Sequence, residues 1–280
     1  MKSAYRVAAV MGWPVAHSRS PLMHRHWLAH YGIDGDYVKL PVRPEDLAAA
    51  LRALPALGIA GCNLTLPHKA AALAAVDEVS PQARRIGAVN SVTVGSGGRL
   101  IGDNSDAFGF IENLHLEAPQ WRPAAGPATV LGAGGAARAV VAALLDAGVP
   151  ELRLVNRDPT RAEALAADFG DRIRVRSWDG RAEALAQSRL LVNATSLGMA
   201  GAPPLDLALD ALAADAVVDD IVYVPLETPL LRAARARGNT TVDGLGMLLH
   251  QGRPGFAAWF GVMPEVTPEL RALMAASLVP

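Results

Sequence analysis

Short apolar runs alternate along this chain with longer segments in which apolar residues recur every three or four positions. Runs rich in valine, isoleucine and leucine predict buried strands, whereas the longer period predicts helices. The expected strands cover residues 5–10, 37–40, 59–66, 87–94, 152–156, 173–175, 190–193, 216–221 and 240–243, with another ending at 131. The expected helices cover residues 44–54, 77–86, 160–169 and 228–237. Four others start near residues 20, 67, 107 and 244, and one ends near residue 147. Further helices are expected between the strands that follow residue 173. This alternation predicts an α/β fold, and 280 residues suggest about two domains.

A glycine-rich turn joins the strand that ends at residue 131 to an alanine-rich helix. Gly132, Gly134 and Ala137 have the G-x-G-x-x-G/A spacing of a dinucleotide-binding turn. Glycines let backbone N–H groups approach a pyrophosphate, and the start of the helix adds partial positive charge. An ordinary βα connection can have the same composition, so the function of this turn depends on the rest of the chain.

The end of the next expected strand bears on the choice of cofactor. Asn156 and Arg157 lie about 25 residues after Gly132, where an arginine accommodates the 2′-phosphate of NADP. Asp158 follows directly and would oppose that phosphate if its carboxylate pointed toward it. The alternative for both charged residues is that they form the polar start of a helix.

Polar residues also gather where the strand over residues 59–66 ends. Asn63, Thr65 and Lys69 lie there, and open α/β sheets bind ligands at the carboxyl ends of their strands. We expect Pro67 to start a helix, which places Lys69 in its first turn, where a cation is disfavoured by about 0.3–1 kcal/mol. This unfavourable placement favours a functional role for Lys69 over that of a solvated surface lysine.

Other polar groups stand at the starts of helices. Ser20 precedes Pro21 and is a good N-cap, whereas Ser18 has no evident capping role, so its hydroxyl is a candidate ligand group. Residues 103–106 (DNSD) supply more polar groups than one N-cap requires.

Two strand ends and a helix in the last third complete the candidate site. Residues 193–196 (NATS) and 220–223 (DIVY) can line the crevice for a nicotinamide. Met247 and Gln251 are four residues apart and share one face of the helix that starts near 244. Met247 suits either the core or a contact with a flat ring.

Charge and composition exclude several classes of protein. A formal net charge of −1 gives no electrostatic basis for binding nucleic acid or a membrane surface. No apolar run approaches the ~18 residues of a membrane helix, and the apolar stretch after Lys2 lacks a signal-peptide core. Cys62 is the only cysteine, which excludes an internal disulfide and favours a reducing compartment, so we expect a cytoplasmic protein. His24, His26 and His30 have no carboxylate or cysteine close by in sequence, and no metal site is expected.

Several of these segments occur in the order found in the shikimate dehydrogenase family, which the chain resembles over nearly its whole length. The substrate-loop and lysine motifs of that family correspond to residues 16–21 (AHSRSP) and 63–69 (NLTLPHK). The other matching segments are residues 87–90 (GAVN), 102–106 (GDNSD), the glycine-rich turn, 156–157 (NR), 193–196 (NATS) and 244–251 (GLGMLLHQ).

The resemblance implies an N-terminal three-layer α/β substrate domain, residues 1–105 and 243–280. It also implies a Rossmann-like NADP-binding domain with a doubly wound parallel sheet, residues 106–242. The implied reaction is the reversible, NADPH-dependent reduction of 3-dehydroshikimate to shikimate in chorismate and aromatic amino acid biosynthesis. Lys69 would be the acid/base and Asp106 its partner. We expect a monomer or a homodimer.

The resemblance further assigns ligand-binding roles by position. Shikimate would be bound by Ser18, Ser20, Asn63, Thr65, Lys69, Asn90, Asp106, Tyr223 and Gln251. NADP would be contacted by Gly132, Ala133, Gly134, Gly135, Ala136, Asn156, Arg157, Arg161, Thr195, Ile221, Gly244 and Met247.

Two positions depart from the family pattern. His68 stands where many members carry phenylalanine and could change the pKa of Lys69 beside it, and Asp158 stands where threonine or serine is usual. One alternative is therefore an NAD-using quinate/shikimate dehydrogenase. Another is a non-catalytic NADP-binding sensor, which would need neither Lys69 nor Asp106.

Overall fold

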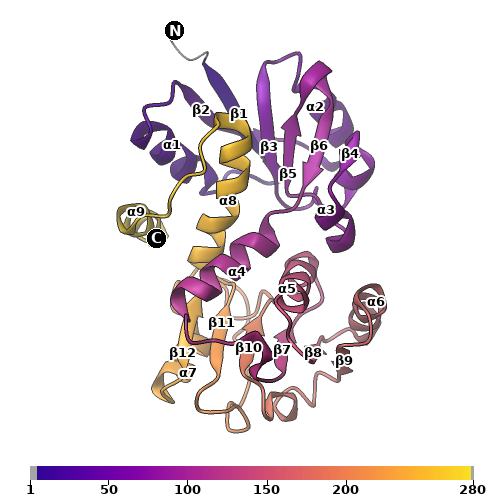
Figure 1. Ribbon diagram of the computed structural model, residues 1–280, viewed down its shortest axis with the longest axis vertical. Coiled ribbons are helices and arrows are strands. Elements are labelled where there is room, and N and C mark those ends of the chain that lie inside the picture. The colour runs from indigo at the N-terminus through magenta and orange to yellow at the C-terminus, as the bar shows by residue number, and fades with distance from the viewer. Residues whose placement is uncertain (1–4, 279–280) are drawn as a thin grey trace. The chain divides into compact units, whose positions relative to one another are not determined.

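The computed structural model describes residues 5–278, and the chain divides into two compact units. Unit 1 comprises Met1–Ser105 and Gln251–Ser277, and unit 2 comprises Asp106–His250 and Leu278–Pro280. The chain passes from one unit to the other after Ser105 and again within helix α8 (Gly244–Phe260) (Figure 1). The domain limits and domain roles expected from the sequence stay a prediction.

Unit 1 is built on a six-stranded mixed sheet with the strand order β2-β1-β3-β5-β6-β4. Its strands are β1 (Arg6–Gly12), β2 (Gly35–Pro41), β3 (Ile59–Leu64), β4 (Glu78–Val79), β5 (Ser91–Val94) and β6 (Leu100–Asp103). Strand β1 pairs in parallel with β2 and β3, whereas β5 runs antiparallel to β3 and β6. The carboxyl ends of β1 and β3 therefore lie side by side at one edge of this sheet.

Two separate cores cover the two faces of this sheet. The helices are α1 (Ser20–His30), α2 (Leu47–Ala53), α3 (Pro81–Ile86), α9 (Pro268–Ala276) and the second part of α8, with 3-10 turns η1 (Pro44–Asp46), η2 (Ala71–Ala74) and η3 (Ser96–Gly98). An aliphatic core includes Leu47 and Leu51 of α2. An aromatic core joins His24 of α1 to Phe256 and Trp259 of α8. These layers confirm the expected three-layer α/β architecture.

Unit 2 is built on a fully parallel six-stranded sheet with the strand order β12-β11-β10-β7-β8-β9. Its strands are β7 (Ala128–Leu131), β8 (Leu152–Val155), β9 (Ile173–Arg176), β10 (Leu190–Asn193), β11 (Val217–Asp220) and β12 (Thr240–Asp243). Counted from the first strand of the unit, this is the 3-2-1-4-5-6 order of a Rossmann sheet. The expected doubly wound parallel sheet is confirmed, and the order reverses between β7 and β10.

The two faces of the second sheet are covered differently. Its helices are α4 (Asp106–Glu117), α5 (Gly135–Asp146), α6 (Pro159–Phe169), α7 (Pro229–Ala236) and the first part of α8, with 3-10 turns η4 (Pro123–Ala125) and η5 (Glu183–Leu185). Helices α5 and α6 follow β7 and β8 and pack on those strands and on β9 (Figure 1). The other core is formed by α7 together with Leu185, Leu205 and Leu212.

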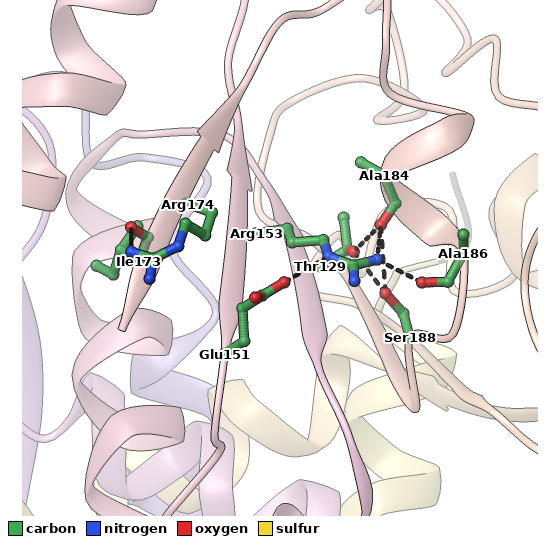
Figure 2. A network of polar contacts seen from close by, with 8 residues as sticks. All are labelled: Thr129, Glu151, Arg153, Ile173, Arg174, Ala184, Ala186 and Ser188. Atoms are coloured by element: carbon green, nitrogen blue, oxygen red, sulfur yellow. Dashed lines mark hydrogen bonds and ion pairs between the residues drawn. The ribbon is translucent and has the colours of Figure 1, made fainter. Parts of the chain in front are cut away.

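A network of hydrogen bonds connects η5 to the sheet of unit 2 (Figure 2). Arg153 of β8 donates to the carbonyl oxygens of Ala184, at 3.0 Å, and Ala186. The hydroxyl of Thr129 on β7 donates to the Ala184 carbonyl at 2.8 Å and also hydrogen-bonds Ser188. The network joins η5 to β7 and β8 and supplies donors to the carbonyl oxygen of the buried Ala184.

The prediction of helices between β9 and β10 and between β10 and β11 was wrong. Between β9 and β10 the structure has only the 3-10 turn η5, and residues 194–216 contain no helix. Gly198, Gly201, Pro203 and Pro204 interrupt this segment, and each disfavours a continuous helix. Its leucines at 197, 205, 209 and 212 are instead buried in an irregular chain, whereas Met199 is exposed.

The helix expected over residues 77–86 was wrong in its first part. Glu78 pairs with Ile101 at the edge of the first sheet, and α3 starts only after Ser80. The Ser80 hydroxyl accepts the N–H of Ala83 at 3.0 Å and caps that helix. Gly87 ends it in the left-handed region, at φ 76°, so β5 begins later than expected.

Among residues 5–278, no helix is long and apolar enough to cross a membrane. Within the same range, no three histidine, cysteine or acidic side chains gather in a way that could hold a metal ion. Lys2 lies outside the described residues.

Candidate active site

The first group of site residues lies where β3 ends in unit 1. The Asn63 side chain is buried, its Oδ1 accepts the Tyr37 hydroxyl at 2.7 Å, and its Nδ2 donates to the Asn90 carbonyl at 3.2 Å. Thr65 directly follows the strand, and its N–H donates to the carbonyl of Met11 at the end of β1. Strand pairing therefore places predicted ligand groups beside the end of β1.

Asn90 links three segments of unit 1. Asn90 is 1% exposed, its Oδ1 accepts the backbone N–H of Ser105 at 2.9 Å, and the Ser105 hydroxyl oxygen lies 3.2 Å from the same Oδ1. Its Nδ2 donates to Oε1 of Gln251 at 3.5 Å, while the Ser105 hydroxyl donates to the Gln251 carbonyl at 2.8 Å. The structure thus brings together Asn63, Asn90 and Gln251, which are far apart in the sequence.

Lys69 does not lie in the first turn of a helix, so the expected helix start at Pro67 was wrong. Residues 67–70 form turns, and the 3-10 turn η2 begins only at Ala71. The Lys69 carbonyl accepts the N–H of Val89 at 2.8 Å, so this carbonyl is paired with a distant segment and not within a helix. The helix-dipole reason for assigning Lys69 a role therefore does not hold, and its role depends on the motif alone.

His68, beside Lys69, is turned into the protein. Its side chain is 1% exposed, and its Nε2 lies 2.9 Å from the Val42 carbonyl oxygen. A carbonyl oxygen only accepts, so this hydrogen bond places a proton on Nε2. The backbone N–H of His68 donates to the Thr65 carbonyl, which helps to fix the turn that carries Lys69.

The two serines of the substrate loop lie at the start of α1, and neither caps that helix. Arg19 is the N-cap position of α1, and Ser20 is the first helical residue, so the expected Ser20 cap was wrong. The Ser18 hydroxyl instead accepts the Ser20 N–H at 3.4 Å. Ser20 is buried, with 8% of the residue exposed.

The glycine-rich turn in unit 2 has the geometry of a phosphate cradle. Gly132 follows β7 at φ 108°, and a Cβ there would lie 2.8 Å from the Ala194 carbonyl oxygen. Gly134 is the N-cap of α5, without a side-chain cap, and a Cβ at Gly134 or Gly135 would meet open space. Backbone N–H groups at this helix start thus have room for an anion.

The polar residues that follow β8 differ in their contacts. Asp158 is the N-cap of α6, and its Oδ1 accepts the Thr160 N–H at 3.0 Å. Its Oδ2 lies 3.5 Å from Nε of Arg161, and Asn156 Nδ2 donates to its carbonyl at 2.8 Å. Arg157 is exposed. The Asp158 carboxylate is thus held by its own helix, which lessens its opposition to a phosphate beside Arg157.

Two loops at the carboxyl ends of β10 and β11 are joined through the buried carboxylate of Asp220, whose place in the segment 220–223 the sequence indicated but whose linking role it did not. Asp220 accepts hydrogen bonds from Asn193 Nδ2 at 2.9 Å, from the Val222 N–H at 3.1 Å and from the Thr228 hydroxyl at 2.7 Å. Asn193 Oδ1 in turn accepts the N–H and hydroxyl of Thr195 at 3.1 and 2.7 Å. Burial raises the pKa of Asp220 to about 6, although these hydrogen bonds oppose the shift.

The remaining predicted residues lie at the start of two helices and after β11. A Cβ at Gly244 would lie 2.2 Å from the Ile221 carbonyl oxygen, so glycine is required where α8 approaches this loop. Tyr223 and Met247 are partly buried. Asp106, 6% exposed, is the first residue of α4.

Comparison with known proteins places these motifs in a family. Residues 10–92 match the family model described as shikimate dehydrogenase substrate binding domain, and residues 123–199 match the model described as shikimate / quinate 5-dehydrogenase. A relative from Rhodospirillum rubrum named shikimate dehydrogenase (NADP(+)) is 63% identical over 271 residues, which cover 95% of this chain and 96% of the relative.

Solved structures of similar proteins share the whole fold. Shikimate 5-dehydrogenase from Thermus thermophilus, in complex with NADP(H) and shikimate, is 42% identical, with a TM-score of 0.84 and coverage of 98% of each chain. Quinate dehydrogenase from Corynebacterium glutamicum, in complex with NAD, is 33% identical, with a TM-score of 0.90 and coverage of 97% of this chain and 99% of that one.

Proposed function

Because this chain belongs to the shikimate dehydrogenase family, we propose that it catalyses the reversible, NADPH-dependent reduction of 3-dehydroshikimate to shikimate. The observation that carries this function is the 63% identity, over 95% of the chain, to a relative named for that activity. The pathway, a cytoplasmic location and a monomeric or homodimeric state are further expectations that accompany it.

The polar groups of unit 1 support a small polyhydroxy acid as the substrate. Ser18, Ser20, Asn63, Thr65, Asn90 and Gln251 are proposed to bind shikimate, together with Tyr223 of unit 2. A site built from buried hydroxyl and amide groups rejects a substrate that leaves those groups unpaired. Asn63 suits this role because the hydrogen bonds to Tyr37 and Asn90 account for its Oδ1 and one Nδ2 proton, which leaves one Nδ2 proton for a ligand.

Lys69 is proposed as the general acid and base of the reaction. During reduction, negative charge develops on the carbonyl oxygen of the substrate, and the Nζ ammonium would stabilise that charge and donate the proton. During oxidation, the amine would accept the proton of the hydroxyl group. Asp106 is proposed to orient Lys69.

The residues of unit 2 fit NADP. The uncapped start of α5 and the open space above Gly134 and Gly135 suit a pyrophosphate, and Thr195, Ile221, Gly244 and Met247 are proposed to contact the rest of the cofactor. Bound NADPH supplies the hydride. Arg157 is proposed to bind the 2′-phosphate together with Asn156 and Arg161, because guanidinium groups match phosphate geometry.

A second candidate is an NAD-using quinate/shikimate dehydrogenase. The similarity to the quinate dehydrogenase with NAD, at a TM-score of 0.90, and the presence of Asp158 favour it. The capping role of Asp158 and the exposed Arg157 favour NADP instead.

Initial rates of absorbance change at 340 nm with shikimate or quinate, and with NADP⁺ or NAD⁺, test the proposed function. We expect the highest kcat/KM for shikimate with NADP⁺. A higher value for quinate with NAD⁺ would support the second candidate. Cofactor binding without turnover of either acid would contradict both and support a non-catalytic sensor.

A further inference from the structure

Tyr37 is a buried residue whose hydroxyl contacts a proposed substrate-binding side chain. The residue is 0% exposed, and its hydroxyl is 2.7 Å from Asn63 Oδ1. Tyr37 lies in β2 and Asn63 lies in β3, both within unit 1. One hydroxyl therefore joins β2 to the end of β3.

The direction of these hydrogen bonds determines what Asn63 presents to a ligand. A carboxamide oxygen only accepts, so the Tyr37 hydroxyl donates to Oδ1. The Nδ2 group then faces away from Tyr37, where one of its protons goes to the Asn90 carbonyl at 3.2 Å. The second proton remains a donor for a hydroxyl or carboxylate oxygen of the substrate.

The ring of Tyr37 is itself held firmly. His24 stacks on it with centroids 3.9 Å apart and an angle of 5° between the planes, and the Trp259 ring lies 6.0 Å away. Burial lowers the pKa of His24 to about 3, so its ring is neutral at physiological pH and adds no charge beside Tyr37. The ring thus has a fixed position and uncharged neighbours.

We propose, on the basis of the function proposed above, that Tyr37 is a positioning residue for shikimate. Its hydroxyl fixes the Asn63 carboxamide with Nδ2 toward the substrate. Without that hydroxyl, Oδ1 loses its buried donor and the carboxamide is free to rotate. Tyr37 touches no reacting atom, so its loss should weaken substrate binding more than it slows the chemical step.

The test is Tyr37→Phe, which removes the hydroxyl and keeps the ring. We expect the KM for shikimate to rise about tenfold, the size expected for one buried hydrogen bond, with kcat and the KM for NADP⁺ within about twofold of the unsubstituted enzyme. In an Asn63→Ala background, the same substitution should add little further change, because the group it orients is gone. The matched control is Tyr31→Phe, whose hydroxyl accepts the Glu265 N–H at 3.1 Å in the same unit. That control should leave both KM values unchanged.

An unchanged KM for shikimate in folded Tyr37→Phe would overturn the inference. So would an equal rise in that KM when Tyr37→Phe is made in the unsubstituted enzyme and in the Asn63→Ala variant. A second measurement needs no substitution: the side-chain amide NMR signal of Asn63 should shift when shikimate is added to the unsubstituted protein, and an unmoved signal at saturation would also overturn it. Failure of the unsubstituted enzyme to oxidise shikimate would refute the proposed function, and with it the inference. Normal oxidation with an unaffected Tyr37→Phe variant would refute the inference alone.

Discussion

Asp220→Asn tests how a buried carboxylate organises the second unit. Asp220 is 0% exposed and accepts three hydrogen bonds, from Asn193, Val222 and Thr228. Asparagine has the same shape and keeps one acceptor oxygen, and Thr228 can rotate its hydroxyl to accept from the new amide. The substitution therefore removes mainly the ionisation of the group.

The expected magnitude follows from the pKa. Burial raises the pKa of Asp220 from 3.8 to about 6, a change of about two units, which corresponds to about 3 kcal/mol at 1.36 kcal/mol per unit. Between pH 4 and pH 6, the folded protein binds a proton at this site that the unfolded chain has released. This group therefore makes its full contribution to stability below about pH 4, and that contribution falls as the pH rises to about 6.

Urea unfolding followed by circular dichroism from pH 4 to pH 7.5 measures this effect. Relative to the unsubstituted protein, Asp220→Asn should gain about 3 kcal/mol in its free energy of unfolding between pH 4 and pH 7. The control is Asp215→Asn, whose exposed carboxylate pairs with Arg189. The free energy of unfolding of Asp215→Asn, relative to that of the unsubstituted protein, should change little from pH 4 to pH 7. If the Asp220→Asn and unsubstituted curves run parallel from pH 4 to pH 7, the assignment of a raised pKa to Asp220 is wrong.

Two further substitutions test the cofactor site and the second sheet. Arg157→Ala should raise the KM for NADP⁺ about tenfold, because a hydrogen bond to a charged phosphate is lost, and should leave the KM for NAD⁺ unchanged in steady-state assays. Equal changes for both cofactors would remove Arg157 from phosphate recognition. Arg153→Ala should lower the free energy of unfolding by about 1–3 kcal/mol, because the η5 segment loses two hydrogen bonds from a charged donor, although Thr129 still donates to the Ala184 carbonyl. Arg99→Ala, which breaks an exposed ion pair with Glu78, should cost no more than about 1 kcal/mol by the same urea titration, and equal losses in the two variants would contradict the structural role of Arg153.

The dinucleotide half of the chain was predictable because its signals are local. A short apolar strand, a glycine turn and an alanine-rich helix follow one another directly, so β7 and α5 could be placed from the sequence. The cap of α7 is also local: Thr228 accepts the Leu231 N–H at 3.3 Å. Periodicity fails in residues 194–216 because their apolar side chains fill a core without forming a regular element.

The environment of Lys69 was not predictable, because it depends on a distant partner. The carbonyl of Lys69 accepts the N–H of Val89, twenty residues later, and no local pattern indicates that contact. Tyr37 could be placed on a strand, but the contacts of its hydroxyl arise only when β2 and β3 are brought together on either side of β1. The motif residues could be identified from the sequence, whereas the side chains and backbone groups that orient them could not.

The central claim is that Lys69 transfers the proton when shikimate is oxidised. The most direct measurement is kcat for shikimate oxidation with saturating NADP⁺ by the unsubstituted enzyme, Lys69→Ala and Lys69→Arg. Lys69→Ala should lose roughly 10²–10⁴ in kcat with a smaller change in KM. Lys69→Arg should lose a similar factor, because a guanidinium keeps the charge but does not give up its proton near neutral pH. A near-normal kcat in folded Lys69→Ala would contradict the claim.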